Sequence, residues 1–354
     1  MHDNAPDKED VEASGSRETR RSLRRRAPWL AGLLAGIAAL AALILFITHA
    51  GDITTFARQA ANAKAGPLFG AVAVQALPYL ITAFVWFLFL RRTGTPLKFM
   101  SLVPLSFAKL FADQAIPSGG LSGAAFFLFA LTQRGVPDKA AFRTFVFTTS
   151  AYFLAFLGAA IISLIALSLA ENAPPALSAS VSAFAGFFVL LTVLAGLAIL
   201  YTAPMPAFLA GRRFAQKAAE FLGAAIADIR HMPHLFAKLA LLLLASRVMD
   251  GLTVMLISDA IGAPVPLFTG FIAVATASIA ATIGPVPMGL GTFEAGMIAS
   301  LSVFGVSVED ALTITLIYRG LTLWLPLLPG FAILQREFLR RPAAMAEKTD
   351  PDQA

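Results

Sequence analysis

The chain has 354 residues, of which 58% are hydrophobic and 14% are charged, and its formal net charge is +6. Since a soluble domain carries about 25% charged residues, this composition excludes an ordinary soluble enzyme and predicts an all-α, polytopic helical membrane protein. The chain has no cysteine, and its four histidines lack the spacing of zinc ligands, so neither a metal site nor a cofactor is expected.

The N-terminal region combines a polar segment with the first long apolar run. Residues 1–27 end in a cluster of arginines and predict a disordered, basic cytoplasmic tail. Residues 28–50 exceed the core of a signal peptide, which is about 7–15 residues long, so we interpret them as an uncleaved membrane anchor.

Further apolar runs predict full spans over residues 67–90, 142–170, 179–201, 239–260 and 311–334. Together with the anchor they give about six spans, because each run approaches the length of a spanning helix. The transmembrane domain is therefore expected over residues 28–340, followed by a second disordered cytoplasmic tail over 341–354.

Two other apolar regions, 99–133 and 268–304, are broken near their middle by proline and glycine. Each arm is shorter than the about 20 residues that a spanning helix needs. Because unpaired backbone is tolerated at membrane depth only where protein or a water-filled cavity covers it, we predict two re-entrant helical hairpins. Two short full spans per region are the alternative interpretation. At the tips, Gly119, Gly120, Gly289 and Gly291 would let backbone amides approach a lipid headgroup, and Pro117 is a further candidate at the first break. Tight turns without a binding role are the alternative for these glycines.

The distribution of basic residues predicts the orientation of the chain. With a cytoplasmic N-terminus, 22 of the 27 Lys and Arg residues fall in cytoplasmic segments, two in outer segments and three inside apolar segments. Cytoplasmic loops of membrane proteins carry an excess of basic residues, so both termini are expected in the cytoplasm. We therefore predict a multi-pass protein of a bacterial-type inner membrane.

The cytoplasmic connection 206–238 carries apolar side chains at helical spacing, flanked by basic residues. This pattern favours either an amphipathic helix on the inner membrane surface or a helix packed beneath the bundle. The sequence leaves both interpretations open.

The two broken regions align with each other at a constant offset of 170 residues. Seven positions between 117 and 141 are identical to their counterparts, beginning with Pro117 and Pro287. Basic residues flank the first region and not the second, so the two hairpins are expected to open to opposite sides of the membrane. Residues 67–170 and 239–334 would then form an inverted repeat, an arrangement typical of transporters. A role of the breaks in packing alone is the alternative.

Two ionisable residues lie deep within the second half, Glu294 in the second hairpin and Arg319 in the last span. Ionisable groups at that depth are costly and are functional candidates by default. A guanidinium binds a phosphate through two parallel hydrogen bonds, so we expect Arg319 to meet a lipid phosphate, or to pair with Glu294 in the empty site. A permanent structural pair of Glu294 and Arg319 is the alternative.

Two further charged pairs lie within apolar segments. Lys109 and Asp113 are four residues apart on the first hairpin, and Arg247 and Asp250 are three residues apart in the fifth span. Residues at these spacings share a helix face, so each pair is expected to interact locally. A substrate-binding role stays open for both pairs.

Three stretches carry a resemblance to a known family. They are Ile116-Pro117-Ser118-Gly119-Gly120-Leu121-Ser122-Gly123, then Pro287-Met288-Gly289-Leu290-Gly291-Thr292-Phe293-Glu294, and Tyr318-Arg319-Gly320. They resemble the transmembrane, flippase-like region of the lysylphosphatidylglycerol synthases and their stand-alone relatives. The resemblance implies the handling of membrane lipids, in particular their movement between leaflets. It also implies binding roles for Gly289, Leu290, Gly291, Glu294, Tyr318 and Arg319.

The chain contains no segment for the soluble domain that transfers lysine to phosphatidylglycerol in that family, so synthase activity is not expected. The sequence also has no nucleotide-binding loop and no nucleophile elbow, and no nucleic-acid partner is expected. We therefore expect a flippase-like lipid transporter rather than an enzyme, with anionic membrane lipids as its ligands. The alternative is a non-transporting membrane partner that presents lipid to a lipid- or glycan-modifying enzyme.

Overall fold

The computed structural model describes residues 62–115, 120–169, 226–283 and 287–339, together with a few single positions between 179 and 224. Within these ranges the chain forms helices and no strand. Four helical stretches among them are long and apolar enough to cross a membrane. They are α3 (Ala65–Arg92), α6 (Asp138–Ser168), α10 (Pro233–Ile261) and the C-terminal stretch Val308–Leu339.

These four stretches confirm the long apolar helices predicted near residues 67–90, 142–170, 239–260 and 311–334. The predicted span 28–50 lies outside the described residues, and of the predicted span 179–201 only a few single positions are described. Helices α6 and α10 begin several residues earlier than their apolar runs, because Asp138 in the first turn and Pro233 at the first helical position favour a helix start there.

The C-terminal stretch is not a uniform helix. It consists of α13 (Val308–Arg319), a π-helical turn η2 (Gly320–Trp324) and α14 (Leu325–Leu339). The stretch begins at Ser307, whose Oγ accepts a hydrogen bond of 3.1 Å from the backbone N–H of Asp310. A π-helical turn inside an α-helix often marks a functional site, and this turn directly follows Arg319.

Both broken regions form pairs of short helices. The first pair is α4 (Phe99–Ala115) and α5 (Leu121–Thr132), and the second is α11 (Leu267–Ile283) and α12 (Thr292–Val303), preceded by the short 3₁₀ turn η1 (Pro287–Gly289). In the first pair Ser122 Oγ donates a hydrogen bond of 2.6 Å to the carbonyl of Ala112. In the second, Gly289 lies against Ala281 and Gly296 against Ala277. The chain therefore turns back on itself at each break.

The helices of the second half repeat the order of the first. Each of α10, α11, α12 and α13 begins 168 to 171 residues after its counterpart α3, α4, α5 or α6. The turns recur too, because glycines with φ between 80° and 88° occupy matching positions in the two halves: Gly94 and Gly262, Gly120 and Gly291, Gly135 and Gly305. The helices and turns thus recur at offsets close to the 170 residues found in the sequence.

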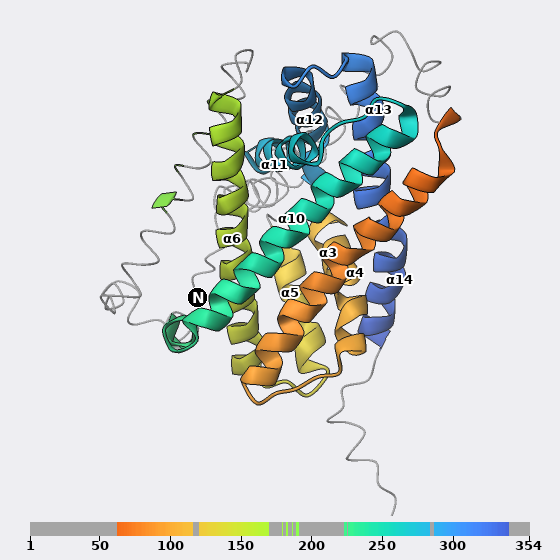
Figure 1. Ribbon diagram of the computed structural model, residues 1–354. Coiled ribbons are helices and arrows are strands. Elements are labelled where there is room, and N and C mark those ends of the chain that lie inside the picture. Colours follow the sequence, from red (N-terminus) through yellow and green to blue (C-terminus); the bar gives the residue numbers. More distant parts are fainter. Residues whose placement is uncertain are drawn as a thin grey trace, which may run out of the picture.

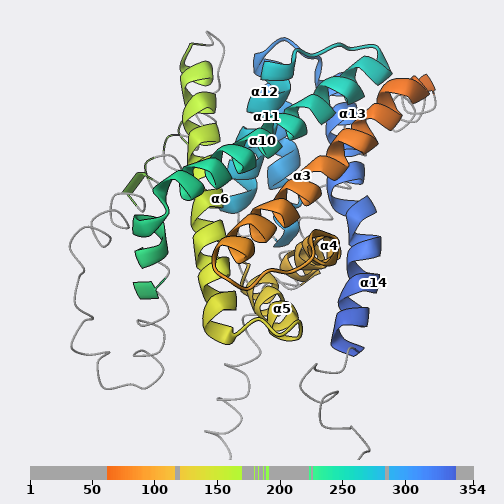
Figure 2. The same cartoon turned by 60° about the horizontal axis from the view of Figure 1, so that its bottom comes forward.

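Helices α3 and α10 run side by side in opposite directions across the bundle (Figures 1 and 2). The backbone N–H of Lys64, before α3, donates a hydrogen bond of 2.9 Å to the carbonyl of Ala260 near the end of α10. The α4/α5 pair follows the end of α3, and the α11/α12 pair follows the end of α10. The two pairs therefore start from opposite ends of the bundle, at the bottom and at the top of Figure 1.

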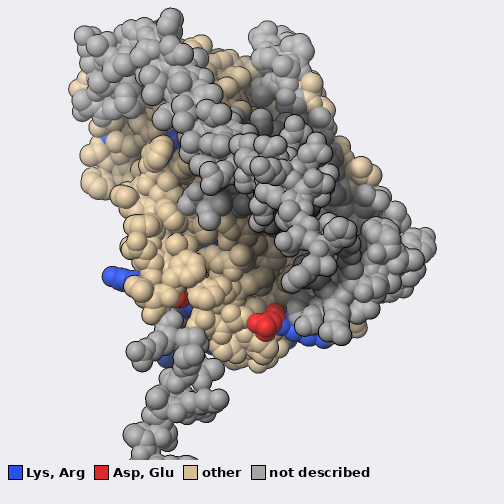
Figure 3. Space-filling model, turned by 180° about the vertical axis from the view of Figure 1, so that it is seen from behind, with Lys and Arg blue, Asp and Glu red and all other residues tan. Residues whose placement is uncertain are grey.

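The surface of the described residues is largely uncharged. Seen from behind, a group of acidic and basic side chains lies near the lower end, and most of the described surface above it carries no charge (Figure 3). Large apolar side chains are exposed in number on the described helices, for example Phe153, Leu241, Leu328 and Phe331. Exposed apolar surface of this extent fits contact with lipid acyl chains.

Glycine allows α10 and α11 to touch backbone to backbone. A Cβ atom added at Gly251 would lie 2.7 Å from the backbone nitrogen of Phe271, and one at Gly270 would lie 2.6 Å from the carbonyl oxygen of Gly251. Such close approach between helices is typical of small residues in membrane proteins.

We expect Gly251→Ala to lower the free energy of unfolding by about 1–3 kcal/mol, because the backbone of Phe271 cannot yield as a flexible side chain can. Gly158→Ala on α6 is the matched control, since its Cβ would meet only the side chain of Leu244 at 4.0 Å. Thermal unfolding of both variants in detergent measures the difference. Equal midpoints would contradict the close contact between α10 and α11.

Candidate functional site

The centre of the second half holds a buried ion pair between α12 and α13. Arg319, at the end of α13, donates from Nε to Glu294 Oε1 at 2.7 Å. Glu294 lies in the first turn of α12, directly after the break. The residues are only 7% and 3% exposed, so both charges are removed from solvent. The pairing predicted from their depth in the sequence is confirmed.

The second oxygen of Glu294 fixes the start of α12. Oε2 accepts a hydrogen bond of 2.6 Å from the backbone N–H of Gly291, which precedes the helix with φ 82°. Glycine adopts this left-handed conformation without a steric penalty. A carboxylate in the first turn also interacts favourably with the positive end of the helix dipole. Glu294 is therefore held by its arginine and by the helix that carries it.

Arg319 contacts the break through a backbone carbonyl and an aromatic ring. Its Nη2 donates to the carbonyl of Met288 at 2.9 Å, and its guanidinium lies 4.8 Å from the centre of the Phe293 ring. Met288 has φ 61°, a conformation that is uncommon for a residue with a side chain. Arg319 thus satisfies a carbonyl that the broken helix leaves without a helical partner.

Tyr318 lies beside the same site. Its ring stacks on Phe293 at a centroid distance of 5.9 Å, and the residue is 4% exposed. Phe293 therefore has Tyr318 and the Arg319 guanidinium as neighbours. The structure brings Tyr318, Arg319 and Glu294 together, as the sequence predicts.

Of the tip residues, Gly289 and Gly291 have different surroundings. A Cβ at Gly289 would lie 2.5 Å from the Cβ of Ala281, so this glycine permits the close approach of the turn to α11. A Cβ at Gly291 would meet nothing within 4 Å, and its backbone N–H is bound by Glu294. Gly289 therefore allows the turn to pack against α11, whereas Gly291 donates the hydrogen bond that holds Glu294.

A second buried cluster lies where α3 crosses α10. Asp250 Oδ2 is 3.1 Å from Arg247 Nη1, and Asp250 Oδ1 accepts a hydrogen bond of 3.4 Å from Gln75 Nε2. Thr253 Oγ1 donates to Gln75 Oε1 at 3.0 Å. The local pair predicted for Arg247 and Asp250 is confirmed, and Gln75 and Thr253 join it from the two crossing helices. Gln75 was not predicted, and the signal for it is a polar side chain within an apolar run.

The first helix pair contains the predicted contact between Lys109 and Asp113, at 2.7 Å. Both side chains are about one quarter exposed, and the carboxylate of Asp113 is far less buried than those of Asp250 and Glu294. A Cβ at Gly123 would overlap Asp113, which places that carboxylate directly against the start of α5. Gly120 starts α5 with φ 88°. The remaining tip residues Pro117 and Gly119 lie outside the described residues.

The three predicted pairs are not assembled into one site. Helix α13 packs against α10, and Tyr318 shares a core cluster with Val254 of α10, so the two central clusters are neighbours. Among the described residues, the ion-pair contact of Lys109 is with Asp113 and does not reach either cluster. The centre of the bundle therefore holds two acid–base pairs, and Lys109 and Asp113 form a separate pair.

Two further ion pairs were not predicted, because their arginines were attributed to cytoplasmic loops. Arg134 binds both oxygens of Glu337, at 2.7 and 2.9 Å, across 203 residues of sequence. A cavity of about 620 Å³ lies beside this pair, between α4 and α14. The one sequence signal was Glu337 itself, an acidic residue at the end of an apolar helix.

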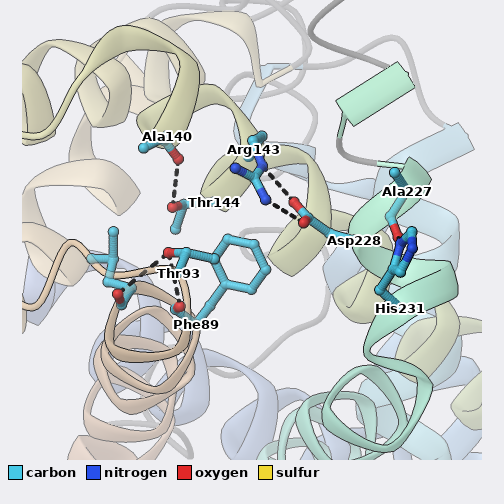
Figure 4. A network of polar contacts seen from close by, with 9 residues as sticks. Phe89, Thr93, Ala140, Arg143, Thr144, Ala227, Asp228 and His231 are labelled. Atoms are coloured by element: carbon cyan, nitrogen blue, oxygen red, sulfur yellow. Dashed lines mark hydrogen bonds and ion pairs between the residues drawn. The ribbon is translucent and has the colours of Figure 1, made fainter.

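Arg143, near the start of α6, binds both oxygens of Asp228, as Figure 4 shows. Asp228 lies in the connection 206–238, whose described end is helical over residues 226–231. Ile229 from this helical turn packs against the core formed by α3, α6 and α10. The described end of the connection is thus packed beneath the bundle, while its remainder lies outside the described residues.

The family described as the lysylphosphatidylglycerol synthase transmembrane region matches residues 30–330 of the chain. No curated protein matches the chain. The matched range includes Glu294, Tyr318 and Arg319, together with both central acid–base pairs.

We expect Arg319→Gln and Glu294→Gln each to lower the free energy of unfolding by about 3–5 kcal/mol, because each leaves a buried charge without its partner. The free energy of unfolding of the double variant should fall by much less than the sum of the two single decreases, since no charge is left unpaired. Denaturant titration in mixed micelles measures the coupling energy.

The same cycle on the partly exposed pair of Lys109 and Asp113 is the control, with an expected coupling below about 1 kcal/mol. Additive effects of the Glu294 and Arg319 substitutions would show that the two charges do not depend on each other.

Proposed function

The chain belongs to the lysylphosphatidylglycerol synthase transmembrane family, and from this we propose that it moves an anionic phospholipid or a lipid-linked amphiphile between the leaflets of a cell membrane. The family match over residues 30–330 supports a role connected with membrane lipids. Transport is our extension of that role, and it rests on the surroundings of Arg319.

The buried guanidinium of Arg319 is the observation that carries the proposal. It lies at a break in the helices, where a left-handed turn and the start of α12 bring backbone groups to the same place. A phosphate is a natural partner for such a site, because a guanidinium and the N-terminus of a helix both favour an anion. In the structure the Glu294 carboxylate occupies the position of that anion.

An incoming phosphate would offset part of the cost of opening the pair of Glu294 and Arg319. If a lipid phosphate takes the place of Glu294, Arg319 keeps a negatively charged partner. Glu294 in turn keeps the N–H of Gly291 and the favourable end of the α12 dipole. The observed pair is therefore compatible with exchange, and the alternative of a permanent structural pair predicts no ligand at all.

The relation between the two halves supports alternating access from the two leaflets. Helices α3 and α10 are antiparallel, and the helix pairs that follow them begin at opposite ends of the bundle. We interpret these pairs as re-entrant hairpins of an inverted repeat, as in several families of secondary transporters. Rocking of one half against the other would expose the centre first to one leaflet and then to the other.

We orient the end that carries α3's C-terminus toward the cytoplasm. Arg91, Arg92 and Lys98 lie there, next to the ion pairs of Arg134 and Arg143. The opposite end has Glu309 and Asp310 at the start of α13. The excess of basic residues on one side agrees with the orientation of cytoplasmic loops in membrane proteins.

The proposal is tested by reconstitution into phosphatidylcholine vesicles with a trace of acyl-labelled fluorescent phosphatidylglycerol. A membrane-impermeant reductant should bleach about half of the label in empty vesicles and nearly all of it with wild-type protein. Arg319→Lys should slow the bleaching of the inner leaflet about tenfold or more, because lysine keeps the charge and loses the two-pronged contact.

Arg336→Lys, at the exposed end of α14, is the matched control and should move lipid at the wild-type rate. Bleaching that never exceeds the level of empty vesicles would exclude lipid movement. If a lipid- or glycan-modifying enzyme then co-purified in fixed proportion, the protein would instead be a lipid-presenting partner.

A further inference from the structure

Asp250 is the buried carboxylate with the longest contacts among the described residues. Glu294 accepts hydrogen bonds of 2.7 and 2.6 Å, and Glu337 accepts bonds of 2.7 and 2.9 Å. Asp250 has its arginine at 3.1 Å and Gln75 at 3.4 Å, although it is only 3% exposed. Because these contacts to the charged carboxylate are weaker, Asp250 loses less stabilising interaction when it takes up a proton.

The partner of Asp250 has unused hydrogen-bonding capacity. Arg247 Nε is buried and makes no hydrogen bond, and the guanidinium lies 5.8 Å from the centre of the Tyr152 ring. The Arg247 side chain is 22% exposed, so it reaches the edge of the buried cluster. Arg247 is thus able to turn toward another anion, whereas Asp250 is confined by the two crossing helices.

The groups that face Asp250 come from the helices packed around it. Arg247 is on α10 itself, Gln75 and Tyr79 are on α3, and Tyr318 is on α13. Thr253 of α10 binds Gln75, and Tyr152 of α6 lies beside Arg247. Helix α11 contributes no titratable residue, because its sequence contains none. Arg247 is therefore the one cation among the described groups next to Asp250, and Tyr318 connects this cluster to the Arg319 site.

The two central pairs together have no net formal charge, since Glu294 and Asp250 balance Arg319 and Arg247. An anionic phosphate would add one negative charge to these two pairs. An uncompensated charge in apolar surroundings costs several kcal/mol, and a buried group avoids this cost by taking up a proton.

The proton can be assigned to one of the two carboxylates. Glu294 is stabilised in its charged form by the N–H of Gly291 and by the start of α12. Asp250 lies in the middle of α10, far from any helix start, and has no backbone donor. Asp250 is therefore the carboxylate that neutralises more easily.

We propose that Asp250 is a proton-binding site that couples headgroup binding to proton uptake, an inference that rests on the proposed function. Arg247 turns from Asp250 to the phosphate, and a proton from the aqueous phase binds to the free carboxylate oxygen. With the phosphate and the proton both bound, the two acid–base pairs and their ligand have no net charge, and the headgroup can cross the membrane. When the phosphate leaves on the other side, Asp250 releases the proton there and Arg247 returns to it.

The coupling has a direction. Because the proton and the anionic lipid bind together, an acidic medium outside vesicles drives labelled lipid into the inner leaflet. A lipid that crosses without a proton would show no response to the pH gradient.

Calorimetry with soluble dihexanoyl phosphatidylglycerol tests the proton-binding site directly. The same titration in two buffers that differ in ionisation enthalpy yields the number of protons taken up per bound lipid. We expect about one proton for wild-type protein near neutral pH, and about none for Asp250→Asn, because the amide cannot accept a proton. Asp259→Asn, on the same helix, is the matched control and should keep the wild-type value.

The outcomes separate the inference from the proposed function. Binding without proton uptake in wild-type protein overturns the coupling and leaves lipid binding intact. Absence of binding overturns both. Uptake that persists in Asp250→Asn overturns the assignment to this residue. If Asp250→Asn does not fold, the coupling is tested with wild-type protein in vesicles whose outside medium is acidic. An unchanged distribution of labelled phosphatidylglycerol between the leaflets then overturns the coupling.

Discussion

Charge that is buried among apolar helices has to be neutralised by a neighbour, and this requirement fixes how the helices of the bundle meet. The carboxylates of Asp228, Asp250, Glu294 and Glu337 are buried, and each faces an arginine. In three of the four pairs the arginine comes from another element of the fold. An unpaired charge would cost several kcal/mol, so only the packing that brings these partners together is stable.

The pair of Glu294 and Arg319 and the break between α11 and α12 depend on each other. The break leaves the carbonyl of Met288 and the N–H of Gly291 without helical partners, and the two charged side chains bind them. The break in turn gives Glu294 its place at the start of a helix, where a negative charge is favoured. A continuous helix here would offer neither group, so the irregular backbone is part of the ion pair.

Hydropathy and local spacing predicted much of the fold, because they depend on residues close in sequence. The long helices α3 and α10, both breaks, and the local pairs of Lys109 with Asp113 and Arg247 with Asp250 are found as expected. The contact between Arg134 and Glu337 spans 203 residues and was not predicted. In the sequence, Arg134 cannot be distinguished from the basic residues that cytoplasmic loops carry in excess. The π-helical turn after Arg319 has no sequence signature that separates it from a regular helix.

Under the proposed function, the interaction that stabilises the fold also selects the ligand. Arg319 can leave Glu294 only if another anion takes its place, because the guanidinium would otherwise be buried without a partner. A neutral headgroup offers no such replacement, so the helices stay held together in its presence. The preference for an anionic headgroup then requires no separate recognition element, since it follows from the cost of leaving a buried charge unpaired.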